Sequence, residues 1–158
     1  MLAADARLGL SVQSSVIGFA VYSPSAGLLD WGTICCRYHR GDQALSKIAV
    51  LIEKYGPIEL KIEDHRSNTF RRGEVACLRI KQALMLARKQ GLSAKQLSPH
   101  EMKQNLNLDP SSNRHDISLL IAKLFPVLAD RLPKPRKIWQ SESRGMSMFM
   151  AVALAIAE

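Results

Sequence analysis

The sequence predicts a single α/β domain, built on a mixed sheet of about five strands with helices on both faces. Three observations lead to this prediction: three β-prone runs come first, helical and strand patterns then alternate, and an apolar helix closes the chain. Strands joined by short turns pair antiparallel, whereas strands separated by a helix usually pair in parallel. The chain has 158 residues, which fits one domain over residues 1–158.

The strands are predicted from runs of β-branched and apolar residues between turn signals. Ser14-Ser15 joins the first two runs, and Pro24, Ser25 and Gly27 form the turn to the third. In the fourth run apolar and charged residues alternate, which is typical of a strand with one solvated face or edge. The predicted strands are Arg7–Gln13, Val16–Tyr22, Leu28–Cys36, Ile58–Glu63 and Ala94–Leu97.

Helices are predicted where apolar residues recur at helical spacing next to capping residues. Asp42 can cap the first helix, and Gly56-Pro57 ends it. Ser98 and Glu101 form a capping-box pattern around Pro99 at the start of a short helix. The remaining predicted helices are Val75–Gln90, Ile117–Phe125, which follows a capping pattern at Asn113 and Asp116, and Arg144–Ala157.

The composition indicates a globular protein with a polyanionic partner. Apolar residues make up 47% of the chain, and 22 Lys and Arg residues stand against 14 Asp and Glu residues, a net charge of +8. A basic excess of this size favours nucleic acid as the partner. No membrane partner is expected, because the longest apolar run, Met146–Ala157, is too short to cross a bilayer.

The cysteines and the start of the chain predict a cytoplasmic protein. Cys35 and Cys36 are adjacent and rarely form a disulfide, and Cys77 lies in an apolar helix pattern. Free, partly buried thiols are typical of a reducing compartment. The first five residues are too short and too polar a stretch for a signal peptide. No spacing of Cys and His suggests a zinc site.

Six segments together resemble the RuvC family of Holliday-junction resolvases, in the order that the family has them. The first looks like the family's "I-L-G-I-D-P-G" strand followed by "T-G-Y-G-V", and the last looks like its "D-A-L-A-L-A" helix. The segments are Arg7–Val21, Ile62-Glu63, Phe70–Ala87, Ser98–Lys103, Arg114–Phe125 and Phe149–Ala155. The resemblance implies a ribonuclease H-like fold and a role in DNA recombination or repair. It also implies a homodimer, with the helix Val75–Ala87 as the candidate dimer interface.

RuvC-type nucleases use converging carboxylates to hold two divalent metal ions. The resemblance implies that Ser11, Glu63, Ser147 and Met150 stand at the four positions of these acids. Only Glu63 is a carboxylate, and the soft thioether of Met150 does not suit a hard cation. We therefore expect no bound cofactor and a lost or weakened nuclease activity.

Two alternatives stay open at this point. In the first, an active endonuclease has relocated its ligands, so that Glu63, Asp64 and Glu142 hold Mg²⁺ or Mn²⁺. Neighbouring residues of a strand point to opposite sides, which argues against the pair Glu63 and Asp64. In the second, the fold serves only as a non-catalytic subunit for protein interactions.

Basic residues near the candidate site are the expected contacts to branched or structured nucleic acid. Asn68, Thr69 and Phe70 accompany the first group and suit phosphate hydrogen bonds and base stacking. A second basic group, at positions 134, 136 and 137, precedes Trp139. The expected nucleic-acid contacts of the first group and its surroundings are Arg66, Arg71, Arg72, Arg79, Lys81, Lys103 and Arg114.

Overall fold

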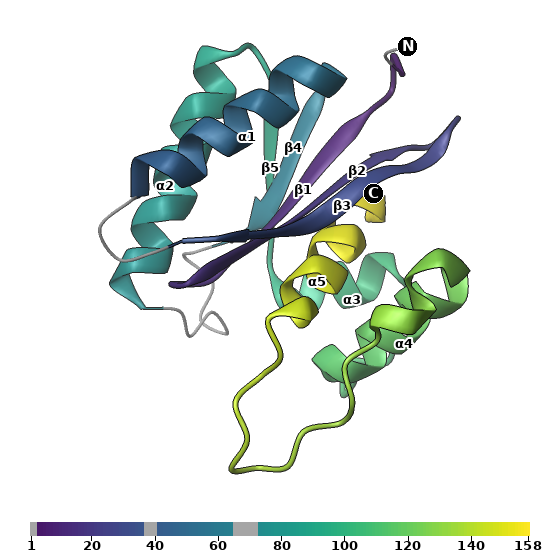
Figure 1. Cartoon of the computed structure of the whole chain (residues 1–158). Helices are drawn as coiled ribbons and strands as arrows, with labels where there is room; N and C mark the ends of the chain where they lie inside the picture. Colours follow the sequence, from purple (N-terminus) through teal and green to yellow (C-terminus); the bar gives the residue numbers. More distant parts are fainter. Residues whose placement is uncertain (1–2, 37–40, 65–72) are drawn as a thin grey trace.

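A five-stranded mixed sheet forms the centre of the computed structural model, which describes residues 3–36, 41–64 and 73–158 (Figure 1). The strand order is β3-β2-β1-β4-β5. The first three strands pair antiparallel, and β4 and β5 then add in parallel beside β1. The predicted mixed sheet is therefore confirmed. The strands are β1 (Arg7–Val12), β2 (Val16–Ser23), β3 (Gly27–Cys35), β4 (Glu59–Glu63) and β5 (Ser93–Leu97).

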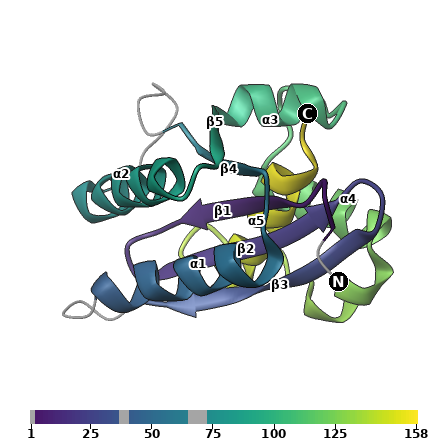
Figure 2. The same ribbon diagram turned by 90° about the horizontal axis from the view of Figure 1, so that it is seen from above.

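Helices cover both faces of the sheet, as predicted. On one face α1 and α2 pack against the sheet, and on the other α5 lies across β1 and β2, with α3 and α4 on its side (Figures 1 and 2). A short 3-10 helix, η1, follows α4. The helices are α1 (Gly41–Tyr55), α2 (Glu74–Lys89), α3 (Pro99–Asn105), α4 (Arg114–Leu124), η1 (Pro126–Arg131) and α5 (Gly145–Ile156).

The pleat of the central strands divides their side chains between two cores. Leu8 and Leu10 of β1 and Ile62 of β4 pack with α1 and α2. The alternate positions face the other way, so Ser11 and Glu63 lie on the face that α5 covers. The candidate site is therefore set on the α5 side of the sheet.

The backbone of α5 lies directly against two glycines of the sheet. A Cβ atom added to Gly9 would lie 2.2 Å from the carbonyl oxygen of Ala151, and one added to Gly18 would lie 2.0 Å from that of Ser147. No side chain fits at either glycine. Residues 146–155 are all buried in this contact and the surrounding core, as the apolar run predicts.

Capping explains where the predicted and observed helix boundaries agree and where they differ. The Ser98–Glu101 capping box is present. Asn113 and Asp116 form a second capping box, so α4 begins at Arg114 instead of Ile117. The helix η1 was not predicted, because Pro126 at its start is a residue type that more often ends a helix.

The three cysteines are free. Within residues 3–36, 41–64 and 73–158, no helix is long and apolar enough to cross a membrane.

Candidate nucleic-acid interface

The candidate site begins where β1 and β4 end. Because these strands are parallel neighbours, their carboxyl ends meet at the same edge of the sheet. The Ser11 hydroxyl donates a hydrogen bond to Oε1 of Glu63, at 2.9 Å, and the Val12 N–H donates to Oε2, also at 2.9 Å. The structure therefore brings together Ser11 and Glu63, two positions that the sequence assigned to one site.

Glu63 is engaged within the protein. Glu63 is buried, with only 8% of the residue exposed. A buried carboxylate is costly unless its oxygens accept hydrogen bonds, and here each oxygen accepts one from β1. Ser11 thus supplies a hydrogen-bond donor to Glu63. An acid at position 11 would instead add a second negative charge, which would need a cation to balance it.

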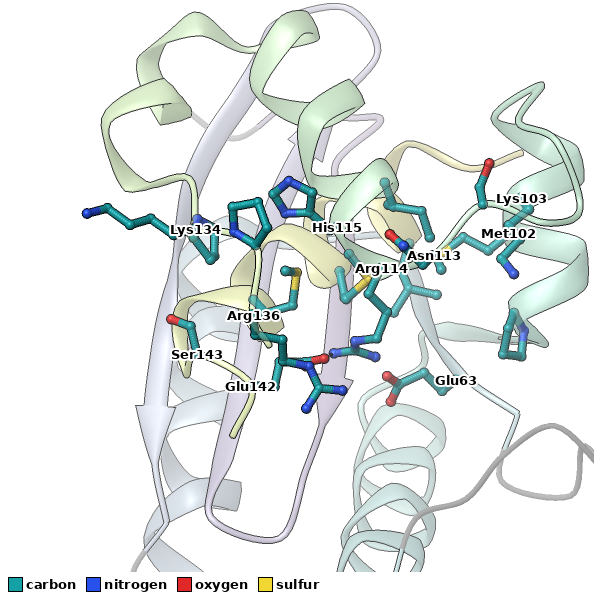
Figure 3. Close-up of a pocket in the computed structure, with 18 of the residues that line it drawn as sticks. Glu63, Met102, Lys103, Asn113, Arg114, His115, Lys134, Arg136, Glu142 and Ser143 are labelled. Atoms are coloured by element: carbon teal, nitrogen blue, oxygen red, sulfur yellow. Dashed lines mark ion pairs between the residues drawn. The ribbon is translucent and has the colours of Figure 1, made fainter. Parts of the chain in front are cut away.

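A second carboxylate, Glu142, lies in the segment between η1 and α5 and is also engaged. Nη2 of Arg114 lies 2.8 Å from Oε1 of Glu142 (Figure 3). Nε2 of Gln13 donates to the same oxygen at 3.2 Å. Arg114 is the first residue of α4, and Gln13 directly follows β1. The guanidinium of Arg114 therefore balances the second negative charge of the site.

These groups border a pocket of about 1010 Å³ between α3, α4, α5 and residues 133–143 (Figure 3). Two carboxylates, Glu63 and Glu142, line it. Five cationic side chains among the described residues also line it, so the pocket favours an anionic ligand. They are Lys103, Arg114, Lys134, Arg136 and Lys137.

The donors of this pocket do not fit the two divalent ions that the family resemblance implies. In the described part of the chain, no three His, Cys, Asp or Glu side chains gather at one place. Glu63, Asp64 and Glu142 therefore do not form the relocated ligand set. Of these, Glu63 is hydrogen-bonded to β1 and Glu142 is ion-paired with Arg114.

Two of the positions matched to family acids lie inside the molecule on α5. Ser147 is fully buried where α5 contacts Gly18, and its hydroxyl has no hydrogen-bond partner among the residues that the structure describes. Met150 packs in the α5 core and contributes to the wall of the pocket. An apolar thioether suits this packing position.

Six of the seven residues expected to contact nucleic acid fall into three groups. Lys103 and Arg114 line the pocket, and Lys103 also donates to the carbonyl oxygen of Pro110 at 3.3 Å. Lys81 is exposed on α2 and does not line the pocket. Arg66, Arg71 and Arg72 lie outside the described residues.

Arg79 is buried and bonds to the protein backbone instead of facing solvent. Only 7% of the residue is exposed, and its guanidinium donates to the carbonyl oxygens of Ser14 and Gln13. These contacts tie α2 to the turn between β1 and β2. The contacts of Arg79 therefore support a role in holding this turn and give no support to the expected contact with DNA.

Two residues of the site were not predicted from the sequence: Gln13, which donates to Glu142, and His115, which lines the pocket. Gln13 was assigned to the first strand, although its place directly after β1 is a signal for the site edge. His115 carries no local sequence sign of a site, and the structure places it in the pocket wall beside Arg114 (Figure 3).

The hydrogen bonds of Glu63 lead to a stability prediction. Replacing Ser11 with Ala is expected to lower the free energy of unfolding by about 1–2 kcal/mol, because a buried carboxylate oxygen loses its donor. Replacing Glu63 with Gln is expected to change it by less than about 1 kcal/mol, since an amide can accept from Val12 and donate to Ser11. Urea denaturation measures both. A larger loss for Glu63→Gln than for Ser11→Ala would contradict the proposed bonding.

The elements are arranged as in a ribonuclease H-like fold: an antiparallel meander is followed by parallel strand pairs, and helices cover both faces of the sheet. The candidate site lies at the ends of β1 and β4. Among solved structures, the chain is similar to RuvC of Thermus thermophilus, with a TM-score of 0.69 and 15% sequence identity over 95% of this chain and 90% of that chain. RuvC of Thermus thermophilus in complex with a Holliday junction substrate matches with a TM-score of 0.69 and 14% identity, over 96% and 90% of the two chains.

No family model matches the sequence, and no curated protein matches it. The similarity to solved structures therefore shows the fold, which is that of RuvC, as the ordered sequence resemblance predicts.

Proposed function

We propose that the protein binds branched DNA at the basic pocket beside Glu63 and does not cleave it. One observation carries the proposal: on a RuvC-like fold, the pocket at the ends of β1 and β4 is lined by five cations, while both of its carboxylates are engaged by donors of the protein itself. The fold match to a RuvC structure in complex with a Holliday junction supports four-way DNA as the substrate class.

The cations of the pocket suit contacts to phosphate groups. Lysine and arginine contacts to phosphates position a protein on DNA without reading its sequence, and they release condensed counterions. Arg114 is held in place by Glu142, so its charge is presented beside Glu63 without a bound metal. Binding should therefore be independent of sequence, strongly dependent on salt and independent of Mg²⁺.

The absence of cleavage follows from the donor set. In a two-metal nuclease, the ions activate water and stabilise the leaving oxygen. Here Ser11 is a hydrogen-bond donor to Glu63, and the positions on α5 offer a buried hydroxyl and a thioether. A single available carboxylate position provides too few hard oxygen ligands for two such ions.

The binding half of the proposal is tested by titrating a four-way DNA junction in EDTA at several salt concentrations. The double variant Lys103→Ala/Lys134→Ala is expected to bind more weakly and to reduce the slope of log affinity against log salt by about 2, or about 1 for each lost cation. A control, Arg88→Ala/Lys89→Ala, removes the same charge from the end of α2 and should keep most of the slope. No binding by the unmodified protein would favour the non-catalytic protein-interaction subunit.

The cleavage half is tested by incubating the same junction with the protein and Mg²⁺ or Mn²⁺. We expect every strand to remain intact. Cleavage that disappears in the Glu63→Gln variant would contradict the proposal and favour an active endonuclease.

We also propose, from the resemblance to the RuvC family, that two copies pair through α2. Leu78 and Met85 are 56% and 67% exposed, and their spacing places them on one side of the helix. This apolar strip lies outside the core and can pack against its copy. Sedimentation at micromolar concentration should show a dimer, and the variant Leu78→Glu/Met85→Glu should be monomeric. Only monomer for the unmodified protein would remove this part of the proposal.

A further inference from the structure

A braced turn in the segment between η1 and α5 presents two large apolar residues to solvent. The N–H of Gln140 donates to the carbonyl oxygen of Lys137 at 2.9 Å, which places Ile138 and Trp139 at the two corner positions of the turn. Two further hydrogen bonds hold it: Lys137 N–H donates to Oε1 of Gln140, and a guanidinium N–H of Arg136 donates to the Gln140 carbonyl oxygen, each at 3.0 Å. The turn is therefore built to hold its corner residues outward.

The residue types at the corners are unusual for a turn. Corner positions usually hold small or polar residues such as Gly, Asn, Asp and Pro. Here Ile138 is fully exposed and Trp139 is 79% exposed. Neither side chain packs into the core of the domain. Both are therefore available to bury apolar surface against another molecule.

The surroundings of the turn select the kind of partner. Lys134, Arg136 and Lys137 flank the apolar pair, and Nζ of Lys137 lies 5.3 Å from the centroid of the Trp139 ring. Ile138 lies at the wall of the basic pocket, and the segment that carries the turn extends away from the body of the domain (Figure 1). An aromatic ring among cations matches a nucleobase with its neighbouring phosphates better than it matches an apolar protein surface.

The state of the DNA bases decides which nucleic acid can use this turn. In a continuous duplex both faces of each base are covered by its neighbours. At a branch point or in a single strand, a base face becomes available to an aromatic side chain. A stacking side chain at the rim of a phosphate-binding pocket can thus distinguish branched from continuous DNA without reading sequence.

We propose that Trp139 stacks on an unpaired or unstacked nucleobase at the branch point, with Ile138 packed beside it and Arg136 and Lys137 on the flanking phosphates. This inference rests on the proposed function, because it assigns to one element the preference for branched DNA. The turn is a binding element and takes part in no chemical step.

Fluorescence gives a direct test, because the chain has two tryptophans. In a Trp31→Phe background Trp139 is the single tryptophan, and titration with a four-way junction or a single strand in EDTA should quench its emission. Continuous duplex should quench it far less. Trp139→Ala should weaken junction binding by about tenfold and leave duplex binding nearly unchanged, whereas Trp139→Phe should recover part of the loss. Val50→Ala removes another exposed apolar side chain, on α1, and should change neither affinity.

The outcomes separate this inference from the proposed function. If the junction binds with unchanged affinity to Trp139→Ala and Trp139 is not quenched, the stacking role is wrong while DNA binding stands. If Trp139→Ala abolishes self-association and leaves DNA affinity unchanged, the turn contacts a second copy and the stacking role is again wrong. If the unmodified protein binds no DNA, both proposals fail.

Discussion

A Ser11→Asp variant is expected to be less stable than the unmodified protein and to regain stability when Mg²⁺ or Mn²⁺ is added. The Ser11 hydroxyl lies 2.9 Å from a carboxylate oxygen of Glu63, so an aspartate at this position would place two buried carboxylates face to face. Two unit charges about 4 Å apart repel by roughly 4 kcal/mol at an effective dielectric constant near 20. Proton uptake relieves part of this repulsion, so we expect the free energy of unfolding to fall by about 2–3 kcal/mol at neutral pH.

A divalent cation that binds between the two carboxylates stabilises only the folded state. At a metal concentration about ten times the dissociation constant, the gain is roughly 1.4 kcal/mol. Thermal unfolding with and without the ion measures it. The matched control is Ser11→Asn, because asparagine has the shape of aspartate without its charge. The stability of this variant should not change when the metal ion is added. A metal response in the unmodified protein would show that its own donors hold an ion, against the proposed metal-independent function.

Replacing Gly18 with Ala is expected to lower the free energy of unfolding by about 3 kcal/mol or more, because the new methyl group collides with a helix backbone. The Cβ atom would lie 2.0 Å from the carbonyl oxygen and 2.1 Å from the carbonyl carbon of Ser147, and 2.6 Å from the amide nitrogen of Met148. A backbone cannot move aside as a flexible side chain can, so α5 would have to lift from the sheet. Urea denaturation reports the loss.

Gly73→Ala is the control for this substitution. A Cβ atom at Gly73 would meet nothing within 4 Å, and its φ of −70° is open to any residue. Gly73 is the N-cap of α2, where alanine is less favourable than glycine, so we expect a loss of no more than about 1 kcal/mol there. Equal stability of the two variants would show that α5 does not lie as close to β2 as the structure has it.

The fold could be predicted from the sequence because local patterns record which side of each element is buried. The alternation of Leu60 and Ile62 with charged residues predicted β4, and the apolar closing run predicted a buried α5. The expected solvated face of β4 was wrong, because the strand lies between β1 and β5 and its Lys61 and Glu63 are buried too. Boundaries were less predictable, since they depend on which capping residue the tertiary structure uses. At α4, Asn113 takes the capping position and lengthens the helix by the turn that precedes Ile117.

The site was predictable only where a residue could be placed by its strand. Ser11 and Glu63 were expected to meet because both were matched to family positions at strand ends. The ion pair of Arg114 with Glu142 was not predictable, because these residues are far apart in the chain and meet through the packing of α4 beside α5. The burial of Arg79 was missed for the same reason, since a cation on a helix gives no local sign that it will bond to backbone carbonyls of another turn.

The contact of α5 with Gly9 and Gly18 has a consequence for the order of folding. The β1–β2–β3 meander joins residues that are close in sequence and can form early, whereas the helix that covers it lies near the other end of the chain. Contacts between distant segments form slowly, because a long loop must close first. Until α5 docks, the face of the sheet that carries Gly9 and Gly18 stays exposed to water. The docking of one apolar helix is therefore expected to be a late step that completes the sheet's second face, and an incomplete chain should be the form most prone to aggregation.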